Sequence, residues 1–185
     1  MAKPPHDMRR AQQVLLEIAR QSTGDAIVGK TRLFKTFYFA HLYYAANSPG
    51  FLTEWPIVRM PNGPGIDNFD LLLSGLVEEK AFVCEPVMIG PFTTTRYRAV
   101  AGIGPESPLS VEELRAIREA VEFTADKTAE QLSELTHEYS RAWNESTEMG
   151  QELNIYRDLL ADDACERLED KAAQVSDEID QLFGG

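Results

Sequence analysis

The sequence predicts a mainly α-helical domain with one small β-hairpin, which places it in the α+β class. Three observations lead to this prediction: helical periodicity of apolar residues covers most of the chain, one pair of β-branched and aromatic runs flanks a Gly-Pro, and two capping boxes open helices in the second half. Hydrophobic residues make up 43% of the 185 residues, enough to bury the core of one compact domain.

The first part of the chain predicts two helices of different character. In residues 7–21, apolar side chains recur at helical spacing opposite charged ones, which indicates an amphipathic helix. Residues 30–46 follow the helix breaks at Gly24 and Gly29 and are apolar or aromatic around most of their circumference. A helix of this kind is expected in the centre of a domain.

The middle of the chain alternates turns with short elements. Residues 47–50 and 60–65 are rich in Pro, Gly and Asn and bracket a short extended piece. Residues 66–77 return to helical spacing. Residues 82–100 then predict the hairpin, because Val, Thr, Phe and Tyr favour pleated surfaces and Gly90 begins the reversal between the two runs.

The second half is predicted to be helical. Ser110 with Glu113 and Thr128 with Gln131 have the spacing of capping boxes, and each pair is followed by apolar residues at helical spacing. A further short helix is expected around residues 152–160.

The end of the chain has the apolar pattern of a coiled-coil seam. Apolar residues alternate spacings of four and three at Ala161, Cys165, Leu168, Ala172, Val175, Ile179 and Leu182. We therefore divide the chain into a domain over residues 1–160 and a heptad-patterned helix over residues 161–185. That helix is expected to pack on the domain or to form a homodimer interface.

The net charge of -12 is unevenly distributed. Residues 1–100 hold 9 acidic and 11 basic side chains, whereas residues 101–185 hold 21 acidic and 7 basic ones. The acidic half repels a polyanion such as DNA, because phosphate binding relies on Lys and Arg. It favours a basic protein partner, or it serves only to keep the protein in solution.

The sequence contains none of the motifs that common enzymes and metal sites require. Cys84 and Cys165 form no paired motif, and His6, His41 and His137 do not have the spacing of a metal site on one helix. Neither a phosphate-binding glycine loop nor a nucleophile elbow is present. We therefore expect no enzyme activity, no cofactor and no metal. Because no membrane span or signal peptide is indicated, we expect a cytoplasmic protein.

The pair Thr136-His137 allows two interpretations. A histidine can act as a catalytic base or contact a partner. It can also lie near the carboxyl end of a helix, where the helix dipole favours a positive ring. The second interpretation is preferred, because the sequence shows no supporting catalytic partner.

The order helix, helix, hairpin over residues 30–100 also fits a winged helix, the alternative class. A DNA-reading winged helix places Arg or Lys along its second helix. Here that helix carries mainly acidic residues, and Arg96 and Arg98 on the second run of the hairpin are weak evidence. A DNA-binding regulator is therefore the minor alternative, and a nucleic-acid partner is not expected.

Three segments together resemble the Panacea or SocA-like antitoxin domain. Residues 30–44 resemble its aromatic helix with the Lys-x-x-Tyr-Phe-Ala kernel. The segment Asn62-Gly-Pro-Gly65 lies where the family carries its Gly-Pro turn. Residues 132–143 resemble the closing Leu-x-x-x-Thr-His and the downstream Trp.

The resemblance implies an essentially all-α protein with a small β element, of bacterial or phage origin. It implies a protein that is encoded beside varied toxins and neutralises them by direct contact or hands them to a protease, without enzyme activity. Related domains also occur with no known toxin partner, which is a further alternative. The family-type positions expected to bind the partner, near the central surface, are Tyr38, His41, Asn62, Thr136, His137 and Trp143.

Overall fold

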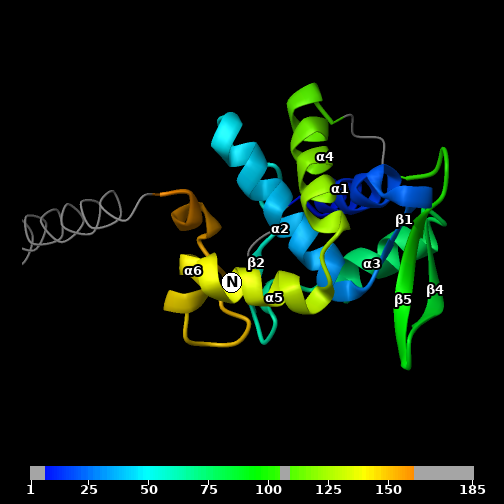
Figure 1. Cartoon of the computed structure of the whole chain (residues 1–185). Helices are drawn as coiled ribbons and strands as arrows, with labels where there is room; N and C mark the ends of the chain where they lie inside the picture. The colour runs from blue at the N-terminus through cyan, green and yellow to red at the C-terminus, as the bar shows by residue number, and fades with distance from the viewer. Residues whose placement is uncertain (1–6, 105–108, 161–185) are drawn as a thin grey trace, which may run out of the picture.

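Helices and two antiparallel sheets form the fold (Figure 1). The computed structural model describes residues 7–104 and 109–160, so the heptad-patterned helix predicted over residues 161–185 lies outside the described residues. The α-helices are α1 (Met8–Gln21), α2 (Lys30–Asn47), α3 (Phe69–Glu78), α4 (Val111–Ala125), α5 (Ala129–Tyr139) and α6 (Arg141–Glu145). Two 3-10 helices are η1 (Thr23–Asp25) and η2 (Ile155–Leu159). The strands are β1 (Ala26–Val28), β2 (Ile57–Met60), β3 (Gly63–Ile66), β4 (Phe82–Ile89) and β5 (Phe92–Ala99).

The predicted α+β class fits the structure, but the expectation of an essentially all-α protein with one small hairpin was wrong. Helices make up 54% and strands 19% of the structure, and the strands form two antiparallel sheets. One sheet has the strand order β1-β5-β4, and a second consists of β2 and β3. The prediction failed because β1, β2 and β3 have only three or four residues each, too few for an alternating pattern to be recognised.

Helix α2 is the centre of the fold, as its sequence predicts. Its residues Leu33, Phe37 and Ala40 are fully buried. The helix contacts α1, α4, α5 and strand β3, and Figure 1 shows it between α4 and the helices of the C-terminal part. A helix with apolar residues on most sides needs such neighbours on most sides. None of the helices within the described ranges is long and apolar enough to cross a lipid bilayer.

Both predicted capping boxes are confirmed. The Ser110 side chain accepts a hydrogen bond from the Glu113 amide at the start of α4, and the Glu113 carboxylate accepts one from the Ser110 amide in return. Thr128 and Gln131 make the same pair of bonds at the start of α5. These caps fix the first turns of the two helices that pack against α2.

The chain after α6 returns to the β2–β3 hairpin as an extended segment. Its backbone hydrogen bonds to β2 run from Gly150 N to Arg59 O (2.9 Å), from Arg59 N to Gln151 O (2.8 Å) and from Leu153 N to Ile57 O (2.8 Å). Strand β2 therefore has backbone partners on both of its edges. The short helix expected around residues 152–160 is present only as η2, because the residues before it pair with β2.

Candidate functional site

Four of the six expected site residues gather at the β2–β3 hairpin. Asn62 lies at the exposed turn between the two strands. Thr136 and His137 lie in the last turns of α5, and Trp143 lies in α6. The hairpin, α5 and α6 therefore meet around these side chains, although they are far apart in sequence.

Gly63 allows the hairpin to approach α2 and α5 closely. Its φ of +94° is a backbone conformation that favours glycine, and a Cβ atom there would lie 2.4 Å from both Lys35 Nζ and Thr136 Oγ1. Thr136 is buried, and its hydroxyl donates within its own helix to the Leu132 carbonyl at 3.1 Å or the Ser133 carbonyl at 3.0 Å. Thr136 is thus part of the support beneath the hairpin and not of its exposed surface.

Stacked side chains fix the other side of the hairpin. The His137 and Trp143 rings lie with their centroids 4.2 Å apart and their planes within 15° of parallel. The guanidinium carbon of Arg59 lies 4.0 Å from the centroid of the Trp143 ring. Arg59 also donates to the Trp143 carbonyl, and the Trp143 indole N–H donates to the Met60 carbonyl at 2.9 Å. Trp143 therefore ties α6 and α5 to β2 through ring contacts and hydrogen bonds.

Two cavities lie beside Asn62 and share it and Thr31 as lining residues. We call the first, of about 190 Å³, the lysine pocket; it is lined by Lys30, Thr31, Phe34, Lys35, Met60, Pro61, Asn62, Gly63 and Pro64. We call the second, of about 320 Å³, the acidic pocket; it is lined by Thr31, Asn62, Ala129, Glu130, Ser133, Glu134 and His137. The Nε2 atom of His137 is buried and has no hydrogen-bond partner within the described part of the chain. The two pockets give the surface around Asn62 a basic side and an acidic side.

Lys35 is a residue of this site that the sequence interpretation missed. Its side chain is only 1% exposed, and Nζ donates to the Pro64 carbonyl at 3.1 Å. Among the described residues, no carboxylate lies within 4.0 Å of Nζ. Burial lowers the pKa of Lys35 to about 7. The sign that could have revealed it is a lysine in a helix that is otherwise apolar around most of its circumference.

Tyr38 joins α2 to the end of the described chain. Its hydroxyl donates to Asp158 Oδ2 at 2.6 Å. The Ser140 hydroxyl donates to the same oxygen at 2.8 Å, and the Ala142 amide donates to Asp158 Oδ1 at 2.8 Å. Burial and the Asp158 carboxylate raise the pKa of Tyr38, so the phenol keeps its proton. Asp158, also missed by the sequence interpretation, connects η2, α6 and α2.

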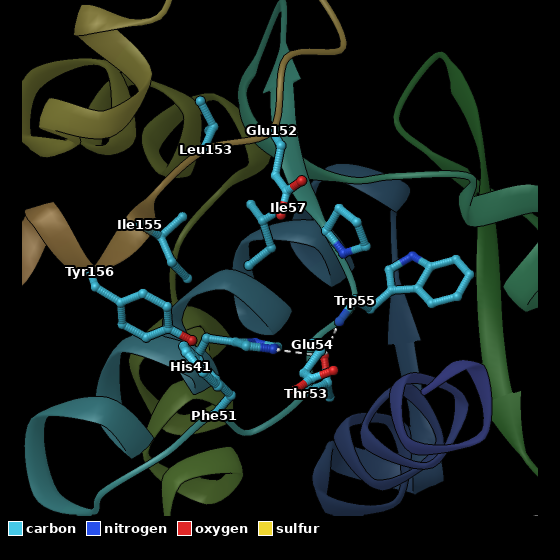
Figure 2. A pocket seen from close by; sticks show the side chains of 11 residues that line it. His41, Phe51, Thr53, Glu54, Trp55, Ile57, Glu152, Leu153, Ile155 and Tyr156 are labelled. Carbon is cyan, nitrogen blue, oxygen red and sulfur yellow. Dashed lines mark hydrogen bonds between the residues drawn. The ribbon is translucent and has the colours of Figure 1, made fainter. Parts of the chain in front are cut away.

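His41 is the sixth expected residue and lies in the wall of a different cavity, of about 370 Å³, shown in Figure 2. Its Nδ1 lies 2.8 Å from the Phe37 carbonyl, which can only accept, so Nδ1 carries the proton. Nε2 lies 3.0 Å from Thr53 Oγ1 and accepts from that hydroxyl. Burial lowers the pKa of His41 to about 4. Both ring nitrogens therefore have partners inside the protein, so His41 supports the packing of α2, and its expected part in partner binding stays a prediction.

Metal-ligand groups and the free cysteine do not meet the requirements of a chemical site within the described part of the chain. Residues 7–104 and 109–160 contain no group of three or more His, Cys, Asp or Glu side chains that could hold a metal ion. Cys84 is a free, exposed cysteine, and partial burial raises the pKa of its thiol. A raised pKa keeps a thiol protonated and therefore unreactive.

Comparison with known families gives a match that covers more than half of the chain. The profile of the antitoxin SocA-like, Panacea domain matches residues 33–144. This range begins in α2 and ends directly after Trp143, so it contains the hairpin and α5. No characterised protein and no solved structure matches the chain significantly.

Substituting Gly63 by Ala tests the close packing of the hairpin. The new methyl group meets Lys35 and Thr136 in addition to the strain of a positive φ, so we expect the free energy of unfolding to fall by about 3 kcal/mol. Gly50→Ala is the matched control, because Gly50 has a similar φ of +91° but nothing within 4 Å of an added Cβ. It should cost about 1 kcal/mol in urea unfolding. Equal losses for both variants would contradict the packing argument.

The buried, neutral His41 predicts a pH dependence of stability. Between pH 6.5 and about 4 the unfolded chain binds a proton at this histidine and the folded chain does not. The free energy of unfolding should therefore fall by up to about 3 kcal/mol as the pH falls through this range. The His41→Gln variant keeps a donor and an acceptor in its side-chain amide. In this variant, the fall in the free energy of unfolding between pH 6.5 and about 4 should be absent, as measured by urea titrations at several pH values. An unchanged slope would show that another group causes it.

Proposed function

The chain belongs to the SocA-like, Panacea-domain antitoxin family, and on this premise we propose that it is an antitoxin-like module that binds a partner protein by direct contact. The partner is a toxin encoded by an adjacent gene, which the module neutralises or delivers to a protease. The family match over residues 33–144 is the observation that carries this proposal. The module acts in the cytoplasm, without catalysis, cofactor or metal.

The surface around Asn62 is the best candidate for the partner contact. Asn62 is exposed at the turn, and His137 lies beside it in the wall of the acidic pocket. Gly63, Thr136 and Trp143 hold this turn from below and from the side. A rigid surface loses little conformational entropy on binding, which favours affinity. Tyr38 and His41 contribute to the proposal only as supports of α2.

An apolar cluster at the free end of the β4–β5 hairpin also supports a protein partner. Met88, Ile89 and Phe92 are exposed by 65%, 57% and 73%, and Ile89 faces Phe92 in the strand register. Residues 86–95 contain no charged side chain. Adjacent exposed apolar side chains are typical of protein-interaction surfaces.

Co-expression with the product of the adjacent gene tests the proposal. We expect that product to inhibit growth alone, to be harmless with this protein, and to co-purify with it. Asn62→Arg places a bulky charge at the turn and should weaken binding at least about tenfold.

The control for that substitution is Asn47→Arg, at the opposite end of α2, where a positive charge suits the carboxyl end of the helix. It should bind like the unaltered protein. An adjacent gene product that is harmless alone, or that stays toxic and does not co-purify, would contradict the antitoxin function for this pair. Equal weakening by both variants would contradict only the proposed surface.

The DNA-binding alternative has one observation in its favour. Strand β1 lies between α1 and α2 and pairs with β5, and α3 precedes the β4–β5 hairpin, as in a winged helix with the β2–β3 hairpin inserted. The charges argue against DNA, because Arg98 is paired with Glu85 and the end of the hairpin is apolar.

A gel-shift titration with the protein's own promoter separates the two functions. Counterion release makes low salt the most favourable condition for DNA binding, so we expect no shift even there. A sequence-specific shift that weakens as the salt concentration rises would support the regulator instead. An unrelated DNA fragment of the same length serves as the control.

A further inference from the structure

The lysine pocket holds a buried amine that has no counter-ion among the described residues. An ammonium group has three donors, and Lys35 uses one of them, toward the Pro64 carbonyl. Phe34, Met60 and Pro61 add apolar walls, so water screens charges poorly in this cavity. A buried cation without a carboxylate is costly, and a negative ligand would reduce that cost.

The same cavity lies at the amino end of α2. Lys30 and Thr31, the first two residues of this 18-residue helix, line it. The N-cap residue is Gly29, which offers no side-chain acceptor to the first amides. An uncapped helix start carries a partial positive charge and free N–H donors. Lys30 adds a partly exposed ammonium, which lies 3.5 Å from the exposed Asp70.

We propose that the lysine pocket is a binding site for a carboxylate group, held between Lys35, Lys30 and the amino end of α2. As part of the proposed antitoxin function, the carboxylate belongs to the partner protein, as an Asp or Glu side chain or as the end of its chain. A cavity of about 190 Å³ suits one such group and is small for a drug-sized ligand.

The charges around the pocket favour a single carboxylate over a polyanion. Glu130 and Glu134 on α5 line the adjoining acidic pocket, and Asp70 lies next to Lys30. These acidic groups repel a phosphate dianion or a nucleic-acid backbone more strongly than a single negative charge. The hairpin residues that line the lysine pocket, Met60 to Pro64, are all uncharged.

An NMR titration of the full-length protein with acetate tests the pocket. The lysine side chains are labelled with ¹³C at Cε, and acetate is added at pH 7 and constant ionic strength, with chloride as the balancing anion. We expect the Lys35 resonance to move in a saturable way toward its charged position, because a carboxylate stabilises the ammonium form. Inorganic phosphate should bind at least about tenfold more weakly.

Two variants separate the pocket from general charge effects. Lys35→Met keeps the length and the apolar stem and should weaken acetate binding at least about tenfold, measured by the shifts of neighbouring amide signals. Lys80→Met removes an exposed lysine elsewhere and should bind acetate normally. If Lys35→Met does not fold, the acetate titration of the unaltered protein still tests the proposal. A Lys35 signal that does not move, or that moves equally with chloride, would overturn the proposal.

A competition experiment identifies the source of the carboxylate. If acetate weakens the co-purified complex and the partner alone shifts the Lys35 signal, the partner supplies the group. If acetate binds but does not compete, the site takes a free carboxylate, and the proposed source is overturned. If no partner binds at all while acetate still saturates the site, the antitoxin function fails and the pocket remains.

Discussion

The close contact of the β2–β3 hairpin with α2 and α5 is the constraint on which the rest of the site depends. Only a glycine at position 63 lets the backbone lie against Lys35 and Thr136. This contact allows the Pro64 carbonyl to accept a hydrogen bond from the Lys35 amine, and it leaves Asn62 at the surface. Met60, on the strand before, then accepts from Trp143, which brings α6 and the His137 ring to the same side.

Residues outside the family-matched range hold this arrangement together. Helix α1 precedes the match and buries Val14, Leu15 and Ile18 completely in the core. After the match, Asp158 binds Tyr38 and Ser140, and the extended segment before it pairs with β2. A shorter chain limited to residues 33–144 would leave the central helix and the outer edge of β2 uncovered. The folding unit is therefore larger than the matched segment.

The sequence was sufficient where local chemistry decides the structure. The capping boxes at Ser110 and Thr128 and the central position of α2 follow from neighbouring residues alone. The β2–β3 sheet was missed, because Gly63-Pro64-Gly65 has the composition of a turn and becomes a strand only through contacts with distant helices.

Some of the site residues could likewise be recognised from the sequence, whereas the role of others is visible only in the structure. Of the family-type positions, Asn62, Thr136, His137 and Trp143 lie around the β2–β3 hairpin, and their part in partner binding stays a prediction. His41 and Tyr38 could not be recognised as buried supports, because their partners Thr53 and Asp158 lie at other positions that no periodicity connects to them. Lys35 belongs to the aromatic helix, but that no carboxylate of the described residues pairs with it can be seen only in the three-dimensional structure.

The charge state of Lys35 links the stability of the hairpin site to the binding of a ligand. With a pKa near 7, the amine changes readily between its neutral and charged forms, so small electrostatic changes decide its state. The unfolded lysine stays charged up to about pH 10, so burial of this amine makes the folded state less stable at neutral pH than an apolar side chain of equal length would. A carboxylate offsets that cost only when it is bound. Lys35 therefore couples the stability of the hairpin to occupation of the pocket, because any ligand that binds only the folded form stabilises it.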